Sequence, residues 1–155
     1  MKKMGKSVVL AAAIMAGVVM SHGVAQAADA DATIKHRRGV MTVIGANMGA
    51  MGCYMKGQCD YNPKVLAKQA KSLQFAATLS LESFRQNVRG GTVKSTASDK
   101  IWSEWDAYAR GTQMMQDRAA DLVTAVKTGD KKQIGMAMGG LGKTCKGCHD
   151  NFRVK

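Results

Sequence analysis

The pentapeptide Cys145-Lys146-Gly147-Cys148-His149, close to the end of the chain, constrains the fold more than any other feature. Two thiols three residues apart, followed directly by an imidazole, form the attachment signature of a c-type haem. Each thiol adds across a haem vinyl group, and the imidazole binds the iron from the proximal side. We therefore expect one haem c, held covalently by Cys145 and Cys148 with His149 as proximal ligand, and a fold that can enclose it.

Three other uses of these cysteines fit less well. A thioredoxin-like Cys-x-x-Cys opens a helix just after a strand, and the sequence predicts no such strand. A structural zinc site needs four ligands, usually two close pairs, and outside residues 1–27 only His36 and His149 remain as histidines. A simple disulfide between the two motif cysteines would leave His149 without a role. Haem attachment uses all three side chains.

The N-terminal region has the pattern of an export signal. Three lysines precede an apolar stretch over residues 7–20, which is short for a membrane span, and Ala25-Gln26-Ala27 supplies the small residues that signal peptidase reads. We expect residues 1–27 to be a cleaved signal peptide and residues 28–155 to form one domain in the periplasm, as in Gram-negative bacteria. The alternative is an uncleaved membrane anchor. After cleavage we expect no membrane span.

The charge of the chain bears on its partners. Without the three signal lysines, 20 of the 23 basic residues remain against 11 acidic ones, a net charge of +9. Such a charge suits steering toward a redox protein with acidic patches, or it serves solubility alone. An exported chain without long basic clusters is a poor candidate for nucleic-acid binding.

The spacing of apolar residues predicts an all-α chain, with a single proline at Pro63. The first helix is expected over about 31–56, ended by Gly57, and the second over about 63–80, started by Asn62-Pro63. Residues 81–100 form a long connection that Phe84 and Val88 pin to the core. The third helix is expected over about 100–128.

A fourth helix is predicted from Asp130 onward. Asp130 and Gln133 form a capping box after Gly129. Apolar residues then recur at steps of four and three, and both motif cysteines fall on this buried stripe: Ile134, Met138, Leu141, Cys145, Cys148 and Phe152. The haem would therefore lie against the interior of a helix bundle.

Taken together, the mature chain resembles the class II cytochromes c, which include cytochrome c′ and the low-spin cytochromes c-556. The segments that carry the likeness are Arg37-Arg38-Gly39-Val40-Met41, Lys56-Gly57 with Asp60-Tyr61, Ile101-Trp102 and Gly142 to Arg153. The resemblance implies a left-handed antiparallel four-helix bundle with covalently bound haem, often a homodimer joined through its first two helices.

The resemblance places Met41 over the distal face of the haem. In cytochromes c-556 this residue is a methionine that binds the iron, whereas in cytochromes c′ it only covers an iron left open to NO or CO. The sequence around Met41 is closer to the c-556 pattern, so we expect its sulfur to be the sixth ligand. The alternative is a packing residue in a methionine-rich stripe.

Two arginines and one histidine are further candidates. Arg37 is a lone cation on an apolar stripe, which is costly unless paired, and a haem propionate is its expected partner. The alternative is an arginine that reaches the surface. Arg153 follows His149 by four residues, so it is expected one turn along the same helix face, and the resemblance places it near the proximal imidazole. The alternative is a solvated charge near the end of the chain. His36 lies off the stripe and is expected to be exposed.

Cys53 and Cys59 depart from the usual pattern of that family. In an oxidising compartment they are expected to form a disulfide across the turn after the first helix. A bridge between two chains of a dimer is the alternative.

These observations predict a periplasmic monohaem electron carrier, with His149 and Met41 as axial ligands and no enzymatic activity. The alternative is a five-coordinate gas-binding cytochrome c′ in which Met41 is only a steric lid. A haem enzyme such as a peroxidase would need a polar acid–base residue on the distal side, and the inward residues near Met41 are predicted to be apolar.

Overall fold

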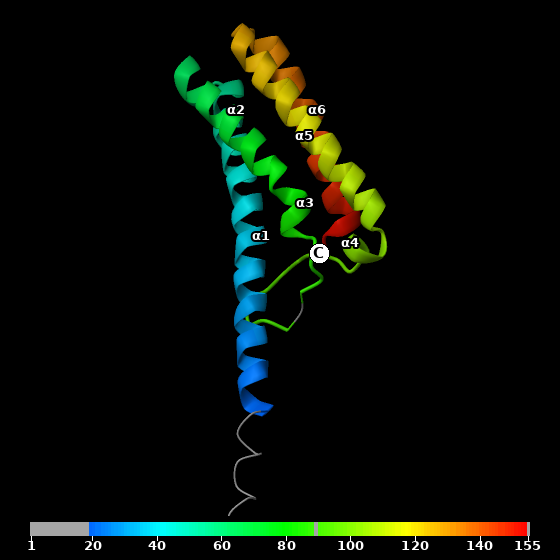
Figure 1. The fold of residues 1–155 in the computed structure, drawn as a ribbon. Helices are drawn as coiled ribbons and strands as arrows, with labels where there is room; N and C mark the ends of the chain where they lie inside the picture. Colours follow the sequence, from blue (N-terminus) through cyan, green and yellow to red (C-terminus); the bar gives the residue numbers. More distant parts are fainter. Residues whose placement is uncertain (1–18, 89, 155) are drawn as a thin grey trace, which may run out of the picture.

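The computed structural model describes residues 19–88 and 90–154, and the side chains from residue 29 onward. Its helices are α1 (Val19–Met55), α2 (Pro63–Thr78), α3 (Ser80–Ser83), α4 (Lys100–Ser103), α5 (Trp105–Thr128) and α6 (Lys131–Phe152). The four long helices run antiparallel in chain order, and α1 packs on α2, α2 on α5 and α5 on α6 (Figure 1). The predicted all-α four-helix bundle is confirmed.

The predicted helix ends are formed by the expected residues. The side chain of Asn62 accepts hydrogen bonds from the backbone N–H groups of Lys64 and Val65, both at 3.1 Å, at the start of α2. Gly57 and Gly129 have φ angles of 67° and 71°, a left-handed conformation that glycine adopts without steric cost. These caps make the turns between the long helices short and well defined.

The capping box at the start of α6 differs in detail from the prediction. Oδ1 of Asp130 accepts from the N–H groups of Lys132 and Gln133, at 2.7 and 3.2 Å. The amide of Gln133 donates to Oδ2 of Asp130, while the Asp130 N–H donates to the hydroxyl of Thr128. The cap is therefore completed by a threonine that the sequence pattern did not single out.

Three helix boundaries differ from the predicted ones. Helix α1 begins at Val19 and not near residue 31, because the alanine-rich segment before Asp31 also favours helix. Helix α2 ends at Thr78, and the separate turn α3 follows it. The predicted third helix is interrupted at Glu104, whose φ of −121° and ψ of 42° are not helical. The sequence does not predict this break, because the spacing of the apolar residues is the same before and after it.

The predicted signal peptide, residues 1–27, falls mostly outside the described residues, since these begin at Val19. Its cleavage stays a prediction. Among the described residues, no helix combines the length and the apolar character needed to cross a membrane.

The core consists of two clusters of buried side chains. The aliphatic cluster runs along the bundle and contains Val40, Ile44, Met51, Leu66, Ala70, Leu73, Ala76, Ala77, Met115, Ala119, Leu122, Ala125, Val126, Ile134 and Leu141. The aromatic cluster lies where α6 ends and contains Phe84, Ile101, Tyr108 and Phe152. Met41 packs against both clusters, so it lies where the two parts of the core meet.

The connection between α3 and α4 is tied to α1 and to the residues where α6 ends. The carboxylate of Asp31 accepts hydrogen bonds from the Thr92 hydroxyl at 2.6 Å and from the Val93 N–H at 2.9 Å. The Ser98 N–H donates to the carbonyl of Phe152, and the Val154 N–H donates to that of Thr96, both at 2.9 Å. The connection therefore closes the end of the bundle where α6 terminates (Figure 1).

Candidate haem site

A pocket of about 500 Å³ opens between α1, α5 and α6, and residues 95–97 of the connection line one side of it. The pocket therefore occupies the seam between α1 and α6. The volume is within the range of about 300–1,000 Å³ that is typical of cofactor sites.

The pocket brings together every residue that the sequence analysis assigned to the haem. Helix α1 supplies Arg37 and Met41, the last turns of α6 supply the motif residues, and Arg153 follows α6 directly. The predicted haem residues that line the pocket are Arg37, Met41, Cys145, Cys148, His149 and Arg153. Residues far apart in the sequence thus line one cavity, as expected from the inward-facing positions predicted on the first and last helices.

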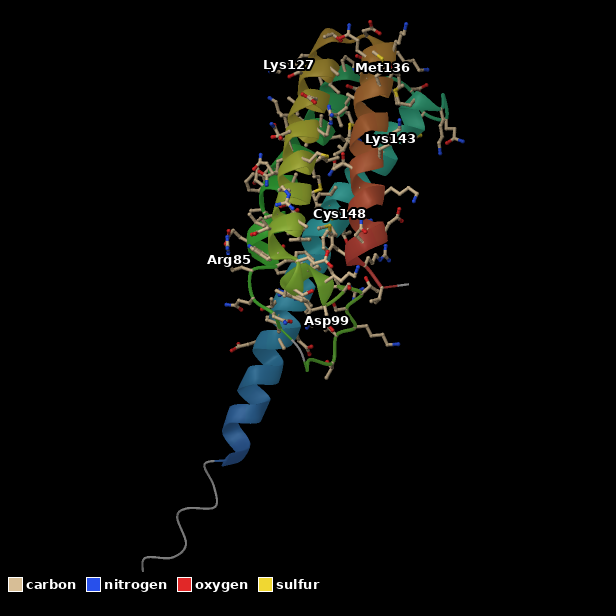
Figure 2. The ribbon with its side chains drawn as sticks, turned by 90° about the vertical axis from the view of Figure 1, so that its right-hand side faces the viewer. Arg85, Asp99, Lys127, Met136, Lys143 and Cys148 are labelled. Atoms are coloured by element: carbon tan, nitrogen blue, oxygen red, sulfur yellow. A yellow bond between two sulfur atoms is a disulfide. The ribbon has the colours of Figure 1, made fainter. Side chains whose placement is uncertain are left out.

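The two motif cysteines lie on the inner side of α6 and are half-buried. Figure 2 shows Cys148 between the ribbons of α5 and α6. Its sulfur lies 3.9 Å from the position that a Cβ on Gly111 would occupy, so the missing side chain at Gly111 gives it room against α5. Burial raises the pKa of both thiols, so Cys145 and Cys148 are protonated near neutral pH.

His149 lines the pocket and is exposed on its other side. Burial of part of the ring lowers its pKa, and the nearby Arg153 guanidinium lowers it further. Both effects favour the neutral imidazole, which is the form that binds iron.

Arg153 does not continue the helix as the sequence spacing predicted. Helix α6 ends at Phe152, and Arg153 has an extended backbone, with φ of −122° and ψ of 131°. Its backbone pairs with Ala97 in an isolated antiparallel bridge, and its Nε donates to the Thr96 hydroxyl at 3.2 Å. The connection segment draws this residue out of the helix, yet its side chain still lines the pocket close to His149.

Arg37 is buried to 97%, so the predicted inward cation is inside the protein and does not reach the surface. Its guanidinium donates to two backbone carbonyls, that of Ser83 at 2.7 Å and that of Gln86. It also lies 5.0 Å from the ring centre of Phe84 and 5.4 Å from that of Trp102. These carbonyl partners were not predicted, because no local pattern links α1 to the residues after α2.

Trp102 is half-buried and has a defined polar contact. Its indole N–H donates to the carbonyl of Phe84 at 2.9 Å. Trp105 is half-buried and lies 5.7 Å, centre to centre, from Tyr108. Both tryptophans pack against the aromatic cluster.

Several lining residues were missed by the sequence analysis. Arg38 and Thr42 line the α1 side next to Met41, and Tyr108 and Thr112 line the α5 side. Arg38 and Thr42 are exposed residues that fall off the apolar stripe of α1, so the periodicity did not select them. The wall around Met41 is thus more polar than predicted.

The pocket is strongly cationic. Arg37, Arg38 and Arg153 line it, and within the described part of the chain no Asp or Glu does. A haem carries two propionates, so its anionic edge suits this environment. Tyr108 also lines the pocket, and its hydroxyl oxygen is enclosed by protein atoms without a hydrogen-bond partner in the described part of the chain. Two thiols, an imidazole, cationic walls and an apolar interior are the donor set that a c-type haem requires, so the residues fit the group.

The remaining cysteines and His36 lie away from this pocket. Cys53 and Cys59 form a disulfide within the chain, with Cα atoms 5.6 Å apart, at the turn after α1 and thus at the opposite end of the bundle from His149 (Figure 1). His36 is exposed. The described residues contain no group of three or more His, Cys, Asp or Glu side chains able to hold a metal ion by themselves.

Comparisons with known proteins agree with this geometry. The family described as Cytochrome C′ matches residues 32–153. Cytochrome c′ of Rhodospirillum rubrum is 33% identical over 131 residues, which cover 84% of this chain and 88% of that protein.

Solved structures give the same result. Cytochrome c prime from Shewanella frigidimarina superposes with a TM-score of 0.75 at 28% identity, covering 81% of this chain and 97% of that one. The nitric oxide complex of a point mutant of cytochrome c prime from Alcaligenes xylosoxidans has a TM-score of 0.74 at 27% identity, with 81% and 97% covered. The chain therefore belongs to the cytochrome c′ family, whose members carry a covalently bound c-type haem.

Proposed function

We propose that this chain is a periplasmic cytochrome in which His149 is the single protein ligand of the haem iron. The iron would take up NO or CO at an open distal position beneath Met41. The sequence analysis favoured Met41 as a sixth ligand. The comparisons favour the alternative, because the relative from Rhodospirillum rubrum is named cytochrome c′ and one of the similar structures is a nitric oxide complex.

The observation that carries the proposal is the place of Met41 in the pocket. It extends from α1, whereas His149 comes from α6, and both line the same cavity. Met41 packs against the aliphatic and the aromatic cluster at once. A flexible thioether that is engaged in packing on two sides suits a steric lid over a small ligand.

Each pocket residue has a separate role in this proposal. When bound, haem c supplies an iron that alternates between Fe(II) and Fe(III) and can accept a diatomic gas. Cys145 and Cys148 hold the group by two thioether bonds, and Arg37 neutralises a propionate from inside the protein. Arg153, beside His149, adjusts the charge around the proximal imidazole.

An electron carrier with Met41 as sixth ligand is the second candidate. It is favoured by the fact that Met41 lines the same pocket as His149, and thioether ligation is established chemistry for c-type haem. In either function the net positive charge would steer the protein toward an acidic redox partner, and a homodimer through α1 and α2 is compatible with both.

The test is the optical spectrum of the purified holoprotein, oxidised and reduced, before and after addition of CO. We expect a broad reduced band that sharpens with CO, and a Met41→Ala variant that keeps its spin state but binds CO more tightly, by about tenfold or more. A sharp α/β pair without a CO response would contradict the proposal and support Met41 ligation. In that case Met41→Ala would become high-spin.

A further inference from the structure

The outer side of α2 presents a line of lysines that ends in a phenylalanine. Along the helix the side chains follow at steps of four, three and four residues: Lys64, Lys68, Lys71 and Phe75. The buried residues of α2 show the same steps two positions later, at Leu66, Ala70, Leu73 and Ala77. Two positions correspond to a rotation of about 200° around an α-helix. The line, called the basic face of α2 below, therefore points away from the core.

The protein does not neutralise the charge of the basic face. Its three lysines are exposed, and α2 contains no Asp or Glu. The ion pairs among the described residues lie on α3, α4, α5 and α6, and none of them includes a lysine of α2. The basic face is therefore a concentrated positive charge that is open to an anionic partner.

Phe75 gives this face an apolar component. It is 67% exposed, more than any other large apolar side chain in the described part of the chain. A single exposed apolar residue is common on protein surfaces, but Phe75 continues a line of cations on one helix side. Lysines combined with an exposed aromatic ring are typical of helices that lie in the interface of an anionic bilayer. The long lysine stems let the charges reach the headgroups while the ring enters more deeply.

The position of α2 in the bundle argues against a redox protein as the partner. Helix α2 packs on α1 and α5, but it makes no contact with α6, which carries the haem attachment residues (Figure 1). No residue of α2 lines the haem pocket. A protein bound to the basic face would therefore be separated from the haem by the body of the bundle. A bilayer on this face would leave the pocket open to the solution.

A second copy of the chain is also a poor occupant of this face. Association about a two-fold axis places the same patch of both copies in contact. Because α2 has no acidic side chain, the lysines of one copy would then meet those of the other without compensation. The charge calls for an anionic partner.

We propose that the basic face of α2 binds the surface of an anionic phospholipid bilayer. The three lysines lie at the lipid phosphates, and the ring of Phe75 enters the boundary between headgroups and acyl chains. The helix lies parallel to the surface, so the association is peripheral. It requires no membrane-spanning helix, and the described residues contain none. The inference goes beyond the proposed function and does not depend on the axial ligands of the iron.

The test measures binding of the holoprotein to vesicles made of equal parts of anionic phosphatidylglycerol and zwitterionic phosphatidylcholine. Vesicles of phosphatidylcholine alone are the uncharged comparison. The protein that sediments with the vesicles is quantified by its haem absorbance. We expect binding to the anionic vesicles only, and we expect it to weaken as salt is added, because salt screens the lysines.

The charge of the face is removed in Lys64→Gln/Lys68→Gln/Lys71→Gln. Glutamine has nearly the helix propensity of lysine, so α2 should still form. Each lysine close to an anionic leaflet adds a factor of about five to binding. We therefore expect the partition coefficient of the holoprotein into the anionic vesicles to fall by about a hundredfold.

The matched control is Lys127→Gln/Lys132→Gln/Lys143→Gln. It removes the same charge from exposed positions on α5 and α6, of which Figure 2 labels Lys127 and Lys143. The control should keep most of the binding, since these lysines do not belong to the basic face. A loss as large as that of the α2 variant would overturn the proposal, because net charge alone would then explain the binding.

The apolar part is tested by Phe75→Ser. This variant should still bind at low ionic strength, but it should lose the binding that persists in high salt. Unchanged salt resistance would overturn the insertion of Phe75. If sedimentation shows a parent dimer that Phe75→Ser converts to monomers, the face belongs to a second copy and the proposal is wrong.

Two further results would overturn the proposal. One is a parent holoprotein that does not bind the anionic vesicles at low ionic strength. The other is a parent that immobilised polyglutamate retains through the α2 lysines while the vesicles do not, since an acidic protein would then be the partner. Failure of the proposed gas binding is seen separately, in the CO response of the parent protein without vesicles.

Discussion

The two ends of this bundle are completed by different means. At the end where α5 meets α6, side chains such as Leu122 and Ile134 are fully buried among other aliphatic residues, and the helix ends are capped by the chain's own groups. At the pocket end, the interior contains Arg37, Tyr108 and two half-buried thiols around a cavity of about 500 Å³. The first end is filled by protein atoms, whereas the second is complete only with the haem.

Because of this difference, one part of the helix pair α5 and α6 stabilises the fold and another part forms the functional pocket. Both α5 and α6 begin or end at the capped turn and run to the pocket, so the same helices contribute to both regions (Figure 1). Tight packing in the aliphatic cluster holds the helices in register. The pocket residues keep polar and reactive groups that would be unfavourable in a closed core.

The largest effect is expected from removing both motif cysteines. In Cys145→Ala/Cys148→Ala the covalent haem is lost completely, since no thioether bond can form, and a haem stain after denaturing electrophoresis measures this. Hydrogen exchange should then rise first in the pocket end, with the helix segments around the fully buried Leu122 and Ile134 protected longest. Cys53→Ala/Cys59→Ala is the control and should retain haem. If the backbone amides lost protection from exchange equally along the whole bundle, the proposed distinction between the two ends would be wrong.

An intermediate effect is expected from truncating one side chain at each end. Leu122→Ala leaves a cavity in a fully buried site and should reduce the free energy of unfolding by about 2–5 kcal/mol. Met41→Ala, beside an existing pocket and only half-buried, should cost clearly less. Urea denaturation of the two holoproteins measures the difference. Equal losses would mean that the pocket wall is packed as tightly as the aliphatic cluster.

The smallest effect concerns the connection that closes the pocket end. Hydrogen bonds from Thr92 and Val93 lower the pKa of Asp31 below its usual value of 3.8 in the folded protein. Because the folded-state pKa is depressed, Asp31 adds stability at a pH above 3.8, and this contribution is lost as the pH falls through the folded-state pKa. Asp31→Asn should therefore show a weaker loss of stability on acidification.

The measurement is the urea midpoint at several pH values between neutrality and pH ~3, the range in which carboxylates protonate. The effect should be slight, because Asp31 is partly exposed and an asparagine oxygen can still accept both hydrogen bonds. Asp60→Asn, at an exposed position after α1, is the control. An identical pH profile for the parent chain and Asp31→Asn would rule out this anchor as a source of acid sensitivity.

Sequence spacing was a good guide to the parts of the fold that depend on near neighbours. The caps at Asn62, Gly129 and Asp130 and the buried stripe of α6 are local patterns, and each formed as predicted or with a small change of partner. The break at Glu104 was not predictable from the sequence. The spacing of the apolar residues continues unchanged across it, so no local pattern indicates that the helix is interrupted. Arg153 left its helix because the distant residues Thr96 and Ala97 pair with it.

The sequence by itself determined that the chain is helical and that its last helix presents two cysteines and a histidine for haem, because both follow from the order and period of neighbouring residues. The tertiary structure decided which side chains meet at the pocket. It buried Arg37 against the carbonyls of Ser83 and Gln86 and placed Tyr108 of α5 in the wall of the same pocket. These features depend on contacts between segments far apart in the chain, and only the packing of whole helices can define such contacts.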